Sequence, residues 1–372
     1  MASSIKTEKI GKLGFGYMRL PRSNDGFDME QINKMADAFL ESGGTYFDAA
    51  YVYEGAEVAL RESVVKRHPR DKIQIATKLN LHFVEKPEQL SEQFNTSLER
   101  LGTDYIDFYL LHGLNAAASK KAEDLGAWAY LIDLKAKGLI RHLGFSFHAP
   151  PEDLDEILSK HPEAEFVQLQ INYIDWDNPK VRSREMYEVA MKHNVPIVIM
   201  EPLKGGMLTA DGSPVTALLR EHSPNASLAS WALRFAASLD GVFVTLSGMS
   251  AFDQLADNIS TFTNFKPLSD EEREILVKAV EIFESVPRVA CTSCRYCVND
   301  CPSKIIIPNL IDMYNSYLVY NTTTNLDHGY RMWTRNGGKA SDCVACRVCE
   351  GICPQKLEIV DTLAKVSALF DK

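Results

Sequence analysis

Cysteine is absent from most of this 372-residue chain, because all eight cysteines lie between Cys291 and Cys353. The remainder neither needs nor can form disulfides, so a reducing compartment is expected. The first ten residues lack the apolar run of a signal peptide, and no later apolar run is long enough to span a bilayer. We expect a soluble, cytoplasmic protein without a membrane partner.

Basic residues are outnumbered in this chain: 40 Lys and Arg stand against 50 Asp and Glu, for a formal net charge of -10. No basic cluster with interleaved aromatic residues stands out, so nucleic acid is not an expected partner. A hydrophobic content of 45% is enough for one large core and a small satellite domain.

The eight cysteines form two copies of the pattern C-x-x-C-x-x-C-x-x-x-C-P. Each copy predicts three ligands for one [4Fe-4S] cluster and a fourth ligand for the other cluster. Two zinc sites or a disulfide scaffold are the alternatives, but zinc spacings usually lack the third cysteine and the trailing C-P. The candidate metal ligands are Cys291, Cys294, Cys297 and Cys301 in the first copy, and Cys343, Cys346, Cys349 and Cys353 in the second.

The cysteine region resembles the two-cluster module of bacterial ferredoxins. Its two copies are separated by residues 303–342, a long stretch with a helix-like segment at 309–320. This region is therefore more similar to the helical two-cluster domains attached to larger redox enzymes. A charged helical segment at 270–284 precedes it, which places the expected division at residues 1–285 and 286–372.

Short apolar runs alternate with amphipathic helical stretches from Leu13 to about Asn264, a pattern typical of βα units. Eight strands, each followed by a helix, predict a closed (β/α)8 barrel. No G-x-G-x-x-G opens any of the helices, which argues against a Rossmann domain. The expected strands span 13–17, 45–48, 73–77, 105–111, 140–145, 166–171, 197–200 and 242–246.

Four polar residues lie at or just after the ends of consecutive expected strands, where barrel enzymes carry their catalytic groups. They are Asp48, Tyr53, Lys78 and His112. Taken singly, each residue has a structural explanation. In the same order, these are a helix cap, an aromatic residue at the barrel rim, a solvated strand end and a histidine of the core. Together they offer an acid with a high resting pKa, a cation, a carboxylate and an imidazole. Their convergence predicts a catalytic site.

Residues 13 to about 264 resemble the aldo/keto reductase family. The stretch 47–53 reads F-D-A-A-Y-V-Y where the family has F-D-T-A-x-x-Y, and residues 76–78 supply the strand lysine. Residues 101–112 match the family's L-G-x-D-x-x-D-x-Y-x-x-H, and 13–21 and 138–146 also fit. The resemblance implies hydride transfer between NADP or NAD and a carbonyl or alcohol substrate.

The same resemblance implies roles for individual residues. Tyr53 would be the general acid, with Lys78 and Asp48 lowering its pKa, and His112 would position the substrate oxygen. Carried over by position, the cofactor contacts would be Gly16, Tyr17, Asp48, Ser146, Gln170, Met200, Leu203, Gly206, Ser247, Gly248, Gln254 and Asn258. The glycines among them are explained equally well by turn geometry.

Two departures from the family pattern concern the cofactor. Met200 stands where many members place an aromatic residue on the nicotinamide, so a flexible thioether replaces a flat ring. Leu246, Ser247 and Gln254 stand where members that favour the 2'-phosphate carry Lys-Ser and a later Arg. The sequence therefore gives no residue-level preference for NADP over NAD.

The joining of the two domains leaves three functional hypotheses. Nicotinamides transfer two electrons as hydride and each cluster transfers one, so direct exchange is awkward without a flavin. The clusters could have a structural role in an ordinary carbonyl reductase. They could instead transfer electrons between the barrel, which would hold FMN, and a redox partner protein. Alternatively, the barrel could be a nucleotide sensor without turnover. The complete set of four strand-end residues favours an enzyme.

Overall fold

The computed structural model describes residues 10–23, 26–263 and 265–371. The described part therefore excludes the first nine residues of the first expected domain and residue 372 of the second. It also excludes Asn264, near the expected end of the barrel. No helix in the described part of the chain is long and apolar enough to cross a membrane.

Eight parallel strands close into a barrel in the order β1, β10, β9, β8, β7, β6, β5, β4, which confirms the predicted fold class. Every predicted strand is present, with its ends shifted by at most three residues. The barrel strands are β1 (Leu13–Gly16), β4 (Tyr46–Asp48), β5 (Gln74–Leu79), β6 (Ile106–Leu114), β7 (Ile140–Phe147), β8 (Phe166–Gln170), β9 (Ile197–Met200) and β10 (Val242–Ser247). A short hairpin, β2 (Arg22–Ser23) and β3 (Gly26–Phe27), follows the first barrel strand.

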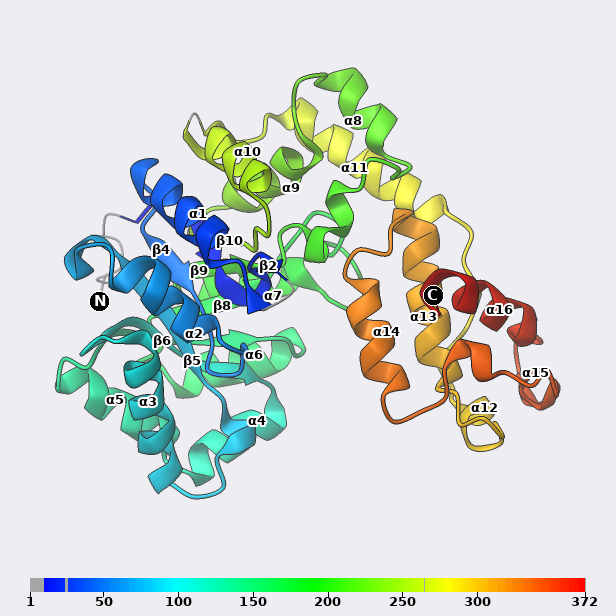
Figure 1. Cartoon of the computed structure of the whole chain (residues 1–372), viewed down its shortest axis with the longest axis horizontal. Helices are drawn as coiled ribbons and strands as arrows, with labels where there is room; N and C mark the ends of the chain where they lie inside the picture. Colours follow the sequence, from blue (N-terminus) through cyan, green and yellow to red (C-terminus); the bar gives the residue numbers. More distant parts are fainter. Residues whose placement is uncertain (1–9, 24–25, 264, 372) are drawn as a thin grey trace. The chain divides into compact units, whose positions relative to one another are not determined.

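Helices lie around the barrel strands (Figure 1). Most of them bury one apolar face, as in α1, where Ile32, Met35 and Phe39 point inward and Asp28 caps the first turn. The α-helix Ala56–Leu60 continues as a π-helical turn, Arg61–Val65. The α-helices are α1 (Met29–Glu41), α2 (Ala56–Leu60), α3 (Glu88–Leu101), α4 (Ala116–Asp124), α5 (Ala127–Ala136), α6 (Pro151–Lys160), α7 (Ser183–Lys192), α9 (Leu228–Ala237) and α10 (Phe252–Thr263).

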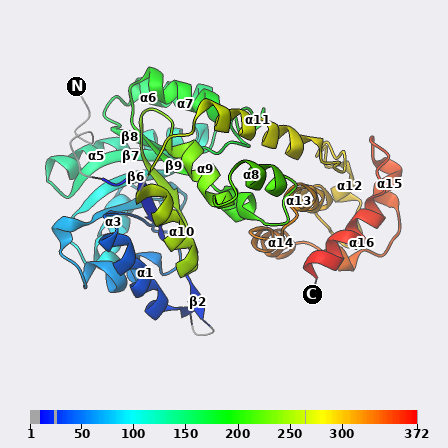
Figure 2. The same ribbon diagram turned by 90° about the horizontal axis from the view of Figure 1, so that it is seen from above.

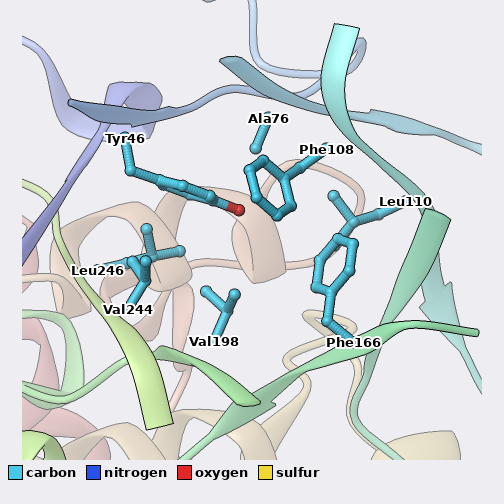
Figure 3. Close-up of a cluster of buried hydrophobic side chains, with 8 residues drawn as sticks. All are labelled: Tyr46, Ala76, Phe108, Leu110, Phe166, Val198, Val244 and Leu246. Carbon is cyan, nitrogen blue, oxygen red and sulfur yellow. The ribbon is translucent and has the colours of Figure 1, made fainter. Parts of the chain in front are cut away.

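The interior of the barrel is filled by apolar side chains from six of its strands (Figure 3). Phe108 is central to this cluster, because its ring lies 5.0 Å from that of Tyr46 and 5.3 Å from that of Phe166. The cluster consists of Tyr46, Ala76, Phe108, Leu110, Phe166, Val198, Val244 and Leu246. This packing closes the barrel centre, so a ligand site must lie at an end.

We expect Phe108→Ala to lower the free energy of unfolding by about 3 to 5 kcal/mol, because it leaves a cavity that the surrounding rings cannot fill. Denaturant titration of the anaerobic protein measures this change. Phe83→Ala is the matched control, since Phe83 is 57% exposed and should cost under about 1 kcal/mol. Equal losses in the two variants would show that the cluster does not stabilise the barrel.

The chain divides into two compact units, Met1–Leu203 with Ala229–Ser269, and Lys204–Leu228 with Asp270–Lys372. The first unit holds the barrel. The second contains the cysteines and also residues 204–228, which connect β9 to α9 along the chain. The expected division of the chain into domains at residues 1–285 and 286–372 stays a prediction.

The second unit is helical, as the resemblance implied (Figure 2). Helix α13 packs against α11, α14 and α16, while α12 packs against α15 and α11 against α8. Asn321 binds the connecting segment by donating a hydrogen bond from Nδ2 to the carbonyl of Gly212 at 3.0 Å. Its helices are α8 (Thr216–His222), α11 (Asp270–Ser285), α12 (Tyr296–Asn299), α13 (Ile307–Tyr320), α14 (Leu326–Thr334), α15 (Val348–Ile352) and α16 (Ile359–Phe370).

Candidate active site and cluster sites

One predicted site residue lies near the carboxyl end of each of the eight barrel strands. Parallel strands in a closed barrel bring these ends to one face, which is where barrel enzymes carry their active sites. In chain order these residues are Gly16, Asp48, Lys78, His112, Ser146, Gln170, Met200 and Ser247. The register pairs Gly16 with Asp48, and Asp48 with Ala76 of the strand that carries Lys78. The fold therefore gathers residues that are far apart in sequence.

A buried ion pair joins two of the predicted catalytic residues. Lys78 Nζ lies 2.7 Å from Asp48 Oδ1 and donates a second hydrogen bond to the carbonyl of Ala49 at 2.6 Å. Burial acts most strongly on Lys78 and opposes its charge, but Asp48 together with Tyr53 and Glu57 more than offsets this, so the pKa of the ammonium is raised. Burial also raises the pKa of Asp48, and the ammonium counteracts this. The pair holds a cation in a water-poor site.

Tyr53 contacts this ion pair and the predicted substrate-orienting histidine. Lys78 Nζ lies 5.3 Å from the centre of the Tyr53 ring, and the Tyr53 and His112 rings meet edge to face at 5.9 Å. The expectation that both Lys78 and Asp48 lower the pKa of Tyr53 is wrong. Burial raises this pKa, Lys78 lowers it, and the negative charge of Asp48 raises it again. Tyr53 is therefore protonated at neutral pH.

His112 is a neutral imidazole in this setting. Burial lowers the pKa of His112 to about 3, and the positive charge of Lys78 acts in the same direction. Within the described residues, His112 Nδ1 and Asp48 Oδ2 are buried polar atoms without a hydrogen-bond partner. Orphaned polar atoms are costly, so two of them among the same four residues fit a ligand that carries polar groups.

Several other predicted cofactor contacts of the barrel form local hydrogen bonds. Ser146 Oγ accepts from the backbone of Gly113 at 2.8 Å, and Asn258 Nδ2 donates to Ser247 Oγ at 2.9 Å. Gln170 Nε2 donates to Asp175 Oδ2 at 3.0 Å. Gln254 accepts from the backbone N–H of Ser250 at 2.8 Å. These bonds fix the strand ends and the loop after β10.

Four of the predicted contacts pack within the barrel. The Tyr17 side chain is fully buried, and its hydroxyl pairs with Ser63 Oγ at 3.0 Å. Only its backbone could therefore touch a cofactor. Gly16 and Gly248 lie together, since a Cβ on Gly16 would come 3.6 Å from Gly248, and Met200 packs on the barrel core.

Leu203 and Gly206 lie at the division between the two units. Leu203 ends the first of the two stretches that make up the first unit, whereas Gly206 belongs to the second unit. Gly206 has φ +92°, and a Cβ there would approach Thr324 Cγ2 at 3.3 Å. Turn geometry and packing within the second unit therefore account for Gly206 without a cofactor.

The structure adds three charged or titratable residues that the sequence reasoning missed. Arg19 Nη2 lies 3.6 Å from Glu201 Oε1, and both charges act on the pKa of Tyr53. Burial lowers the pKa of His148, opposed by Glu201 and by a hydrogen bond to Gln170. Glu201 has a positive φ of 56°, a strained conformation for this residue type. Each lies within three residues of a strand end, a signal that could have found them.

The eight cysteines separate into two groups of four, and each group lines its own cavity. The first cavity is lined by Cys291, Cys294, Cys297 and Cys353, and the second by Cys301, Cys343, Cys346 and Cys349. Their empty volumes, counting space open to solvent, are about 350 and 320 Å³. Each group therefore contains three cysteines from one copy and the fourth from the other.

The state of the thiols counts against the disulfide alternative. All eight cysteines are free of disulfides. Among the described residues, no group of three or more His, Cys, Asp or Glu side chains is arranged to hold a single metal ion. Four free thiols around one cavity are the set of ligands that a [4Fe-4S] cluster uses.

Comparison with known proteins identifies both parts of the chain. A model described as the aldo/keto reductase family matches residues 12–281, so the chain belongs to this family. A second model, described as a 4Fe-4S dicluster domain, matches residues 290–357. The predicted fusion of the two is thereby confirmed.

Relatives and solved structures agree with this assignment. An aldo-keto reductase of Mycolicibacterium vanbaalenii is 30% identical over 241 residues, which cover 63% of this chain and 78% of the relative. The holo form of an aldo-keto reductase from Bacillus halodurans has a TM-score of 0.59 at 28% identity, covering 72% of this chain and 92% of that one. An aldo-keto reductase from Klebsiella pneumoniae in complex with NADPH shares the fold at 20% identity, with a TM-score of 0.59 and coverage of 73% and 91%.

Proposed function

We propose that this protein is an oxidoreductase that transfers hydride between a reduced nicotinamide and a small carbonyl substrate. The observation that carries this proposal is the contact of Tyr53 with both the buried Asp48–Lys78 pair and a neutral His112 at the carboxyl ends of the barrel strands. The test is an anaerobic assay of the full-length protein against a panel of aldehydes and ketones. One nicotinamide should be oxidised for each carbonyl reduced, and no turnover on the whole panel would contradict the proposal.

Each of the four residues has a distinct part in the proposed reaction. A bound reduced nicotinamide supplies the hydride. Tyr53, protonated at neutral pH, donates its proton to the carbonyl oxygen, and the Lys78 ammonium stabilises the phenolate that remains. Asp48 holds the ammonium in place at 2.7 Å. The uncharged His112 can donate a hydrogen bond that orients the substrate oxygen.

We expect the affinities for NADPH and NADH to lie within about tenfold, or roughly 1.4 kcal/mol. A strong 2'-phosphate site usually needs a fork of Arg donors, and here Gln254 occupies the position with its oxygen already bound to Ser250. Calorimetric titration of the anaerobic protein measures both affinities. Gln254→Arg is the matched variant and should shift the ratio toward NADPH. A thousandfold preference in the parent would mean that another residue binds the phosphate.

For the second unit we propose two [4Fe-4S] clusters with crossed ligation. Cys291, Cys294, Cys297 and Cys353 would hold the first cluster, and Cys301, Cys343, Cys346 and Cys349 the second. The two cavities, each lined by one of these groups, support this assignment. Burial raises the pKa of Cys297, and the nearby thiols Cys291, Cys294 and Cys353 raise it further. The free thiols suit a reducing cytoplasm.

The clusters would either transfer electrons to a redox partner protein or support the fold. Hydride carries two electrons and each cluster accepts one, so an electron path from the nicotinamide would need a mediator such as FMN. A spectrum of anaerobically purified protein before and after NADPH addition separates these roles. Bleaching of the cluster absorbance with flavin in the released cofactors would support electron transfer. An unchanged cluster spectrum during carbonyl turnover would support a structural role.

A further inference from the structure

The two cluster sites share one backbone design. Arg295 and Arg347 stand between the second and third cysteines of their copies and have positive φ values of 65° and 56°. Lys304 and Lys356 stand three residues after the last cysteine of each copy, and their φ values are likewise positive, at 54° and 51°. Each arginine lines the cavity of its own copy. The cations are therefore equal in number at the two sites.

The partners of the two arginines differ in charge. Arg295 Nη1 donates to the neutral amide oxygen of Asn309 at 3.3 Å. Arg347 Nη1 binds the Glu350 carboxylate at 2.8 Å, and its Nη2 lies 3.9 Å from Asp361. Asn309 and Asp361 occupy corresponding positions in the two copies, eight residues after the last cysteine. The charge of Arg347 is thus neutralised by carboxylates, whereas the partner of Arg295 is uncharged.

A third carboxylate increases the difference. Asp300, which precedes Cys301, lines the second cavity. The corresponding residue of the other copy is Ile352, which precedes Cys353. One neutral contact acts the other way, because the backbone of Ile305 donates to Cys301 Sγ at 3.4 Å. A single hydrogen bond to sulfur offsets only part of the effect of three carboxylate charges.

We propose that these charges set the order in which the two clusters are reduced: the cluster of Cys291, Cys294, Cys297 and Cys353 has the higher potential. This inference rests on the two-cluster assignment proposed above. Reduction adds a negative charge, which the uncompensated Arg295 favours and the carboxylates around the second cavity oppose. One electron from an external one-electron donor therefore settles on the first cluster, and the second is reduced only afterwards.

A potentiometric titration of the anaerobic holoprotein, followed by electron paramagnetic resonance, tests this order. We expect two potentials whose equilibrium constants for one-electron reduction differ by at least about tenfold, which corresponds to 59 mV. The difference should shrink as salt is added, because Arg347 and Asp361 are exposed. Iron analysis comes first: a protein without two [4Fe-4S] clusters contradicts the assignment itself, whereas two clusters of equal potential contradict only the proposed order.

Two reciprocal substitutions assign the potentials to their sites. Asn309→Asp should lower only the higher potential, and Asp361→Asn should raise only the lower potential. Each shift should correspond to about a twofold change in the equilibrium constant for reduction of that cluster. Asp327→Asn is the control, because it removes an equal charge from exposed α14, away from both cavities, and should move neither potential. If Asp361→Asn instead raises the higher potential, the order is reversed and the inference is wrong.

Discussion

Replacing Tyr53 with Phe should reduce the turnover number for carbonyl reduction by about two to four orders of magnitude. Tyr53 is the residue among the four that is neutral, protonated and in contact with both Lys78 and His112. Phenylalanine keeps the ring that packs against them and removes only the acidic hydroxyl. Nicotinamide affinity should change by less than about threefold, since the proposed contribution of the hydroxyl belongs to the transition state.

Tyr51→Phe is the matched control for this variant. It removes the same hydroxyl two residues away, where the ring lies 4.5 Å from the Arg100 guanidinium. Steady-state assays of both variants, with affinities measured by titration, separate catalysis from folding. Full turnover in Tyr53→Phe on any carbonyl that the parent reduces would remove Tyr53 from the proposed role.

The Cys353→Ala variant should lose the cluster of the first copy, although Cys353 belongs to the second. The reason is that Cys353 lines the cavity of Cys291, Cys294 and Cys297. Three ligands would leave an exposed iron that is readily lost, and a small unit held together by metal should become less stable with it. Iron and sulfide analysis with electron paramagnetic resonance measures the change.

Two further variants identify which cluster is affected. Cys294→Ala alters the same cavity as Cys353→Ala, and Cys346→Ala alters the other. The resonance spectrum of Cys353→Ala should therefore match that of Cys294→Ala and differ from that of Cys346→Ala. The opposite match would show that the ligation is not crossed, and zinc in the parent protein would exclude iron-sulfur clusters altogether.

Much of the barrel could be predicted because its strands are short apolar runs between amphipathic helices. The segment 204–228 could not, because its grouping with the second unit depends on contacts between distant residues such as Gly212 and Asn321. The π-helical turn at Arg61–Val65 also went unnoticed, since its hydrophobic spacing resembles that of an α-helix.

The site was predictable in its positions but not in its electrostatics. Strand-end placement identified Lys78 and His112, but the sequence does not reveal that burial raises the pKa of Tyr53 or that the charge of Asp48 opposes that of Lys78. The burial of Tyr17 depends on its contact with Ser63, which the sequence does not reveal. Likewise, the cysteine spacing predicted the crossed groups, while the unequal charges around them required the positions of Glu350 and Asp361.

Hydride transfer to a carbonyl at the barrel mouth can be followed with nicotinamide deuterated at its reactive carbon. The anaerobic full-length protein would be incubated with this cofactor and the best substrate of the panel, and the alcohol product analysed by mass spectrometry. We expect each product molecule to carry one deuterium from the cofactor on its carbinol carbon, with no hydrogen from solvent at that carbon. Product without cofactor deuterium, or nicotinamide oxidation that reduces the clusters and yields no alcohol, would contradict the proposed hydride transfer.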